Sequence, residues 1–227
     1  MKGDRRNPSY DSYSQVLRWP TERARKWTCE FLDSASTNES LLAVIAIGSA
    51  VRPNVASSDL DLLVISTKAT PLHISPPMEI DLRVYSAATI DVQIARGHDL
   101  LGAAIKFGKA LFQREHSWDS ILDDWKSRLP LPSAALTRER AVNAHERLTK
   151  VLESGDTDAI HEQAISYLTQ LARAELLDHG IYPASRPELA SQLRTANDSQ
   201  IAEQLERLFQ NDQIDKARLA QVLKLTA

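Results

Sequence analysis

The sequence predicts an α+β protein in which a small mixed β-sheet with flanking helices is followed by an α-helical bundle. Three observations lead to this prediction. Apolar runs of strand length lie before residue 115, the segments after residue 133 have helical periodicity, and the segment 129–133 (Leu-Pro-Leu-Pro-Ser) breaks the chain between them. We therefore place one domain at residues 1–129 and a second at residues 133–227.

The first domain is expected to begin with a loose polar segment, residues 1–12, and a helix. The spacing of Ala24, Trp27 and Phe31 places their side chains on one face of that helix. A continuous, β-branched apolar run is then typical of a buried strand. The strands of this domain are predicted at residues 41–47, 59–66 and 79–85, with an edge strand at 110–112. Its helices are predicted at residues 20–34, 100–107 (capped by Asp99 and ended by Gly108) and 118–125.

The second domain is expected to be entirely helical. Asp156 is a suitable cap for its second helix, and Ser185-Arg186-Pro187-Glu188 has the pattern of a capping box at the start of its third. The predicted helices cover residues 134–152, 156–180, a segment from 185, 199–209 and 212–225.

Composition bounds the partners and the compartment. The 227 residues are 43% hydrophobic and 25% charged, with a formal charge of −3. This balance disfavours a broad nucleic-acid surface, although basic residues outnumber acidic ones before residue 27, a pattern we interpret as a solvated helix face and a basic tail. Cys29 cannot form an internal disulfide, and no segment suggests a membrane span or a signal peptide. We expect a cytoplasmic protein without a membrane partner.

The most informative motif joins the first expected strand to the second. Gly48 and Ser49 follow the run 41–47, nine residues intervene, and Asp59 and Asp61 open the next strand. Alternate strand residues point to one face, so the two carboxylates are expected about 6.5 Å apart on the same side. Neighbouring carboxylates repel unless a positive charge lies between them, and oxygen-only ligands favour Mg²⁺. A Gly-Ser turn beside them suits the binding of phosphate by main-chain N–H groups.

This pattern resembles the nucleotidyltransferase superfamily related to DNA polymerase β. Its signature is a Gly-Ser pair at a strand end, a spacer of roughly this length, an Asp-x-Asp pair on the next strand and a third acid on a later strand. Asp81, between Ile80 and Leu82, has the form of that third acid. The resemblance covers about residues 38–114. The remainder is similar more loosely to the appended bundles of small members such as the antibiotic and antitoxin-type minimal nucleotidyltransferases.

The resemblance implies transfer of a nucleoside monophosphate, AMP by preference, from an NTP to an acceptor hydroxyl, with release of pyrophosphate. It implies that Asp59 and Asp61 hold two Mg²⁺ ions, that Asp81 holds one and accepts the hydroxyl proton, and that Gly48 and Ser49 bind the β- and γ-phosphates. The helical domain would then bind the acceptor or a partner. The residues themselves identify neither the donor base nor the acceptor, for which a small molecule, a protein and an RNA stay open, as does a homo-oligomer.

Arg52 and the two serines before Asp59 have two interpretations each. Arg52 lies three residues after Ser49, where its guanidinium would clamp a phosphate or simply lie at the surface before Pro53. Ser57 and Ser58 precede Asp59, where a hydroxyl would bind phosphate or end the loop.

Two rival functions belong to other classes. One is a regulatory module that binds a nucleotide without turnover, against which the intact set of three acids argues. The other is a helical-domain RNase of the HEPN type, which would use Arg173 and His179 on the second helix of the bundle. Residues six apart lie about 120° apart around a helix, and a histidine before Gly180 also suits an ordinary helix end, so we favour the structural interpretation.

Overall fold

The computed structural model describes residues 14–53, 58–68, 75–210 and 216–225. The chain divides into two compact units, Met1–Pro130 and Leu131–Ala227, which are described separately. The first is built on a β-sheet and the second is helical, so the predicted α+β class is confirmed. The polar segment 1–12 lies outside the described residues.

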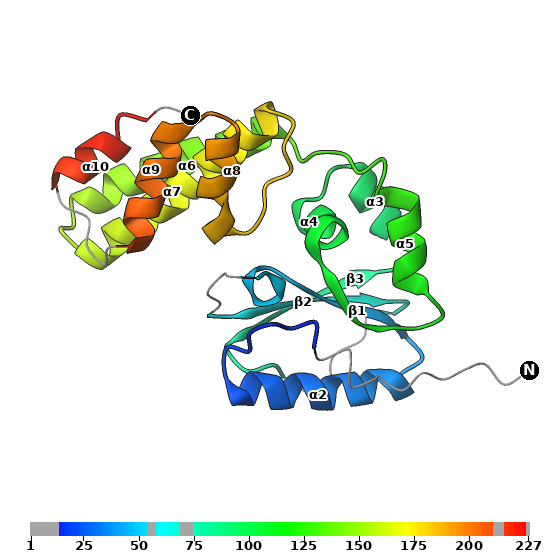
Figure 1. Ribbon diagram of the computed structural model, residues 1–227. Coiled ribbons are helices and arrows are strands. Elements are labelled where there is room, and N and C mark those ends of the chain that lie inside the picture. The colour runs from blue at the N-terminus through cyan, green and yellow to red at the C-terminus, as the bar shows by residue number, and fades with distance from the viewer. Residues whose placement is uncertain (1–13, 54–57, 69–74, 211–215, 226–227) are drawn as a thin grey trace, which may run out of the picture. The chain divides into compact units, whose positions relative to one another are not determined.

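The sheet of the first unit has four strands in the order β3-β2-β1-β4 (Figure 1). The strands are β1 (Leu41–Ile47), β2 (Leu60–Ser66), β3 (Ile80–Ser86) and β4 (Lys109–Gln113). β1 pairs antiparallel with β2 and β4, whereas β3 pairs parallel with β2, so the sheet is mixed. The central strands β1 and β2 are almost completely buried, as their continuous apolar runs predict.

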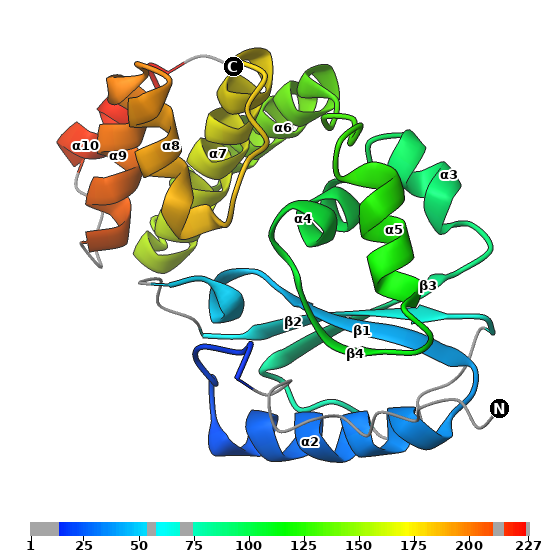
Figure 2. The same cartoon turned by 45° about the vertical axis from the view of Figure 1, so that its right-hand side comes forward.

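Helices cover both faces of this sheet (Figure 2). One face packs on α2 (Glu22–Thr37), and the other packs on α3 (Ile90–Ala95), α4 (Asp99–Phe107) and α5 (Ser117–Trp125). Because strand side chains alternate, Val44 and Leu62 join the core beneath α2, whereas Ile45 and Leu63 join the core beneath the other three helices. The odd-numbered residues of β2 therefore face α3, α4 and α5.

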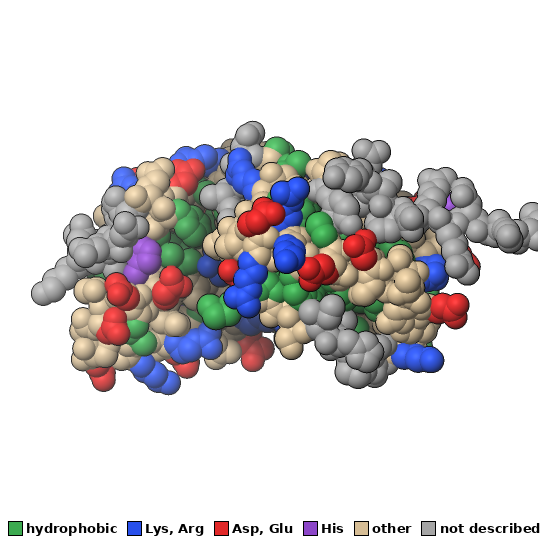
Figure 3. All heavy atoms as spheres, turned by 90° about the horizontal axis from the view of Figure 1, so that it is seen from below, with side chains coloured by type: hydrophobic (Ala, Val, Ile, Leu, Met, Phe, Trp, Pro, Cys, Tyr) green, Lys and Arg blue, Asp and Glu red, His purple; other side chains and the backbone are tan. Residues whose placement is uncertain are grey.

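The outer side of α2 carries mixed charge. Arg25 pairs with Glu22 and Lys26 with Glu30, both at exposed positions, and Figure 3 shows basic and acidic side chains interspersed on this side of the molecule. Exposed pairs of this kind contribute little to stability. The pairing agrees with the interpretation of this segment as a solvated helix face.

Several local expectations for the first unit were wrong in detail. β2 begins at Leu60, one residue after Asp59. The Leu60 N–H makes the first bond towards the neighbouring β3 segment, to the Glu79 carbonyl (2.8 Å). The cap of α4 is His98 rather than Asp99, since the His98 Nδ1 accepts the Leu101 N–H (3.4 Å). The short helix α3 was not predicted. Two turns of helix bury Ile90 and Ile94 there, which is too short a pattern for periodicity to establish.

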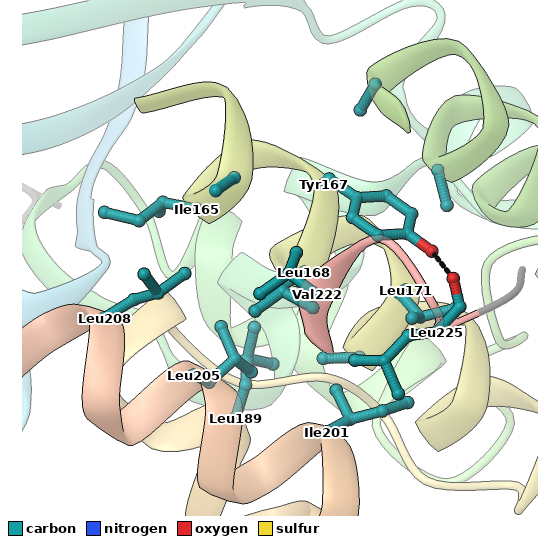
Figure 4. Packing of buried hydrophobic residues seen from close by; sticks show 14 of the residues in the cluster. Ile165, Tyr167, Leu168, Leu171, Leu189, Ile201, Leu205, Leu208, Val222 and Leu225 are labelled. Carbon is teal, nitrogen blue, oxygen red and sulfur yellow. Dashed lines mark hydrogen bonds between the residues drawn. The ribbon is translucent and has the colours of Figure 1, made fainter. Parts of the chain in front are cut away.

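The second unit packs around α7. Its helices are α6 (Ala134–Leu152), α7 (Thr157–Asp178), α8 (Leu189–Thr195), α9 (Ser199–Gln210) and α10 (Lys216–Val222), with a 3₁₀ turn η2 (Arg186–Glu188) before α8. Figure 4 shows the apolar side chains of these helices around Leu168 and Leu171 of α7. The Tyr167 hydroxyl, within the same core, donates to the Leu225 carbonyl. Of the described helices, none is both long and apolar enough to cross a membrane.

Helix ends in this unit follow the predicted caps in one case and not in another. The Asp156 carboxylate accepts the N–H groups of Asp158 and Ala159 at the start of α7, as expected. The Ser185 hydroxyl instead donates to the Glu188 carboxylate (2.5 Å), and the segment begins as a 3₁₀ turn without a side-chain cap. The proline at 187 lacks the N–H that a regular first turn would offer.

Candidate functional site

The candidate site is built on the sharp turn that follows β1. Gly48 has φ 76° and ψ −156°, a conformation that is essentially restricted to glycine. A Cβ atom at this position would lie 2.4 Å from Oδ2 of Asp61, so the carboxylate fills the space that a side chain would need. The next residues form a 3₁₀ turn, η1 (Ser49–Val51), which the Arg52 N–H closes by bonding to the Ser49 carbonyl (3.1 Å). A side chain at residue 48 would therefore displace the Asp61 carboxylate from this place.

Strand register places two of the three predicted acids, Asp61 and Asp81, side by side. Asp61 is the partner of Ile47 in the β1–β2 ladder and of Asp81 in the β2–β3 ladder. Both aspartates lie on the face of the sheet that packs on α3, α4 and α5, and Asp59 precedes Asp61 by two residues at an exposed position. Segments about 20 residues apart in the chain therefore place Asp61 and Asp81 on neighbouring strands at the same height.

The surroundings of Asp61 disfavour its ionised form. The pKa of Asp61 is raised to about 6, chiefly by burial and then by the negative charges of Asp59 and Asp81, while the positive charge of Arg83 opposes the rise. Desolvation and like charge both penalise the ionised form of a carboxylate. A cation beside Asp61 would offset both penalties, so the electrostatic field at this place favours a metal ion or a basic ligand.

Arg83 is the site residue that the sequence analysis missed. Its Nε and one terminal nitrogen donate to the two oxygens of Asp81, at 2.9 and 2.7 Å, in a two-bond ion pair. Both side chains are about half exposed, with relative exposures of 59% for Arg83 and 48% for Asp81. The alternation of a strand, which places residues 81 and 83 on one face, is the signal that could have found this pair.

The donor set fits Mg²⁺ in chemistry, but its members are not gathered as ligands. Asp59, Asp61 and Asp81 offer carboxylate oxygens, the ligand type that Mg²⁺ prefers. Among the described residues no group of three His, Cys, Asp or Glu side chains has the arrangement of a metal site. The Asp81–Arg83 pair gives a physical reason, because both oxygens of Asp81 accept hydrogen bonds from the guanidinium.

The other predicted residues lie around the turn. The Arg52 guanidinium stacks on the ring of Phe107, the last residue of α4, at 4.8 Å from the ring centroid. Ser49 opens η1 directly after Gly48, and Ser58 lies exposed before Asp59, whereas Ser57 lies outside the described residues. The contact with Phe107 is a feature that the sequence could not indicate, since 55 residues separate the two positions.

Phe107→Leu is expected to weaken nucleotide binding if Arg52 contacts phosphate. A leucine fills similar apolar space but lacks the π face that holds the guanidinium, a contact worth about 0.5–1 kcal/mol at partly exposed sites. We expect a roughly two- to fivefold rise in the Kd for Mg²⁺–ATP, measured by calorimetry. In an Arg52→Gln background the same replacement should have no further effect, and an equal effect there would contradict a role through Arg52.

The helical unit contains His179, one of the two residues that the rival RNase function would use. His179 is the C-terminal cap of α7, and its Nδ1 lies 2.9 Å from the carbonyl of Glu175 in the same helix. Imidazole near a helix C-terminus is favoured by the helix dipole. The geometry agrees with the helix-end interpretation of His179.

Comparison with known proteins gives a distant likeness. No protein-family model matches the chain, and no curated protein matches it. Among solved structures, the chain is similar to a nucleotidyltransferase-like protein from Exiguobacterium sibiricum, with 15% sequence identity and a TM-score of 0.42, over 89% of this chain and 71% of that one. At that TM-score the likeness carries no argument about the activity of this chain.

Proposed function

We propose that this protein transfers a nucleoside monophosphate, AMP by preference, from an NTP to an acceptor hydroxyl. The observation that carries the proposal is the Asp61 carboxylate packed against Gly48 at the strand-end turn, in register with Asp81 on the next strand. The turn suits close approach of a phosphate to the main chain, and the acids beside it suit the cation that accompanies a triphosphate.

The residues of the site have distinct roles in this proposal. Gly48 and Ser49 bind the β- and γ-phosphates, and Arg52 and Ser58 bind phosphate oxygens nearby. Asp59, Asp61 and Asp81 would hold two Mg²⁺ ions, which neutralise charge on the entering and leaving oxygens when bound. Positioning of the reactants supplies much of the rate in such a site.

The proposed transfer is a substitution at the α-phosphorus of the NTP by the acceptor oxygen. The acceptor oxygen forms a bond to the α-phosphorus, the bond from that phosphorus to the pyrophosphate oxygen breaks, and the hydroxyl proton passes to the exposed carboxylate of Asp81. Pyrophosphate leaves with the electron pair of the broken bond. The helical unit is the proposed acceptor- or partner-binding part of the chain.

The test combines binding with turnover. We expect Mg²⁺ with ATP to raise the melting temperature, since a ligand at 100 times its Kd stabilises by about 2.7 kcal/mol. Each labelled NTP would then be incubated with Mg²⁺ and with panels of small hydroxyl compounds, tRNA and co-purifying proteins, with pyrophosphate release as the readout. Failure of every NTP to shift the melting temperature at millimolar concentration would contradict the proposal.

A second candidate is a nucleotide-binding module without turnover, and one observation favours it. Asp81 is paired with Arg83 through both carboxylate oxygens, so the third acid is engaged in an ion pair in this structure. A module of this kind would give the melting shift with Mg²⁺–ATP but no pyrophosphate and no labelled acceptor. The two readouts of the same experiment therefore separate the two candidates.

A further inference from the structure

The Asp81–Arg83 pair lies within the predicted cation site rather than beside it. Arg83 is two residues from Asp81 on the same strand, and its ladder partner Leu63 is two residues from Asp61 on β2. Its charge also acts on Asp61, where it opposes the effect of the neighbouring acids. Arg83 is therefore a cation that acts on both Asp61 and Asp81 of this acidic cluster.

The pair is weak enough to be displaced. Exposed ion pairs contribute about 0.2–1 kcal/mol, and the two-bond geometry places this pair towards the upper end of that range, which is still small beside the binding of a divalent cation. Arginine cannot lose its charge in the physiological range, so the pair opens by rotation of side chains and not by deprotonation. A divalent cation carries twice the charge of a guanidinium and would bind oxygens of Asp59, Asp61 and Asp81 together. It would therefore stabilise the ionised Asp81 carboxylate more strongly than Arg83 does.

From these observations we infer that Arg83 is a positioning residue, which competes with the metal for Asp81 and sets the Mg²⁺ concentration at which the site assembles. This inference rests on the proposed function and adds to it a device that links assembly of the acids to the cation. Occupation of the site separates Asp81 from Arg83, and loss of the cation restores the pair. Competition by Arg83 explains why Asp61 and Asp81 lie in register although, among the residues that the structure describes, no three such side chains have the arrangement of a metal site.

The test is titration of the whole chain with Mg²⁺ alone, followed by calorimetry. Removing a competing pair of this strength is expected to tighten the Kd for Mg²⁺ roughly two- to sixfold in Arg83→Gln. Arg83→Lys, which keeps the charge but loses the two-bond fork, should give a smaller change. Lys106→Gln, which removes an exposed positive charge from the last turn of α4, serves as the control for net charge.

A double-mutant cycle shows whether the effect passes through Asp81. In an Asp81→Asn background, Arg83→Gln should change the Kd less than twofold. Equal Kd values for wild type and Arg83→Gln, or equal tightening with and without Asp81, would overturn the inference and leave the proposed function standing. Absence of divalent-cation binding in wild type and Arg83→Gln alike would overturn the inference and leave the proposed function to the melting shift with Mg²⁺–ATP, whereas binding in Arg83→Gln alone would support the competition. Melting temperatures without Mg²⁺ verify that each variant is folded.

Discussion

Asp61→Asn is expected to lower the rate of nucleotidyl transfer by at least about 100-fold, because it removes a charge from the centre of the proposed cation site. In the absence of Mg²⁺ the same replacement is expected to raise the melting temperature. Burial and the charges of Asp59 and Asp81 penalise the ionised Asp61 carboxylate, and an amide of the same shape avoids that penalty. Loss of activity with gain of stability is the mark of a functional acid.

The stability difference is expected to depend on pH in a defined direction. The pKa of Asp61 rises from 3.8 to about 6 in the folded protein, so between these values the folded state binds more protons than the unfolded chain. The free energy of unfolding of the wild type therefore falls as pH increases from about 4 to 6, and it stays lower above pH 6. At pH 8 we expect Asp61→Asn to be more stable by about 1–2 kcal/mol, after allowing for solvent at the half-buried carboxylate.

Thermal unfolding of both proteins between pH 4 and 8 measures this difference, in buffers with EDTA and again with Mg²⁺ and ATP. The advantage of Asp61→Asn should disappear at the acidic end of the range, and ligand should stabilise the wild type much more than the variant. Asp33→Asn, at an exposed position of α2, is the matched control and should leave stability and transfer almost unchanged. Wild-type transfer by Asp61→Asn would exclude the proposed mechanism.

Strands and long helices of this protein could be predicted because their signals are local. The run 41–47 is apolar on both faces, which matches a central strand covered by helices on each side. α6 and α7 have periodic apolar positions over 19 and 22 residues, respectively. The short helix α3 lacks that length, and the cap by His98 depends on a ring orientation that packing against Tyr85 supports. Such features are decided by tertiary contacts.

The candidate site likewise has some features that the local sequence indicates and others that depend on tertiary contacts. The spacing of the motif singles out Asp59, Asp61 and Asp81 as candidates, and strand alternation predicts that Asp59 and Asp61 share a face, although β2 begins only after Asp59. The sequence does not show that Asp61 and Asp81 share a register position, because that requires the parallel pairing of β2 and β3. Pairing of Asp81 with Arg83 and stacking of Arg52 on Phe107 are likewise choices among rotamers that the surroundings decide.

Gly48→Ala is expected to abolish function because the added methyl group would displace the carboxylate of Asp61. The backbone at residue 48 has a positive φ with an extended ψ, where any side chain is strained by about 1–3 kcal/mol. The new Cβ would also lie 2.4 Å from the Asp61 carboxylate oxygen, a distance that no pair of such atoms tolerates, so the carboxylate must move. We expect transfer to fall at least about 100-fold, as in Asp61→Asn, together with a loss of stability.

Gly155→Ala separates these two effects. Gly155 also has a positive φ, 69°, but no atom lies within 4 Å of the position that its Cβ would take. The Gly155→Ala variant should have a free energy of unfolding about 1–2 kcal/mol lower because of backbone strain, measured by urea unfolding that follows the helical unit. Its rate of transfer should stay unchanged. A Gly48→Ala variant that was less stable but still bound Mg²⁺–ATP with wild-type affinity would show that contact between Gly48 and Asp61 does not position the site. If Gly48→Ala does not fold, the double variant Gly48→Ala with Asp61→Ser takes its place, because the shorter serine side chain makes room for the Cβ at residue 48. If the clash between this Cβ and the Asp61 carboxylate is the main cause of the lost stability, the double variant regains stability but not transfer.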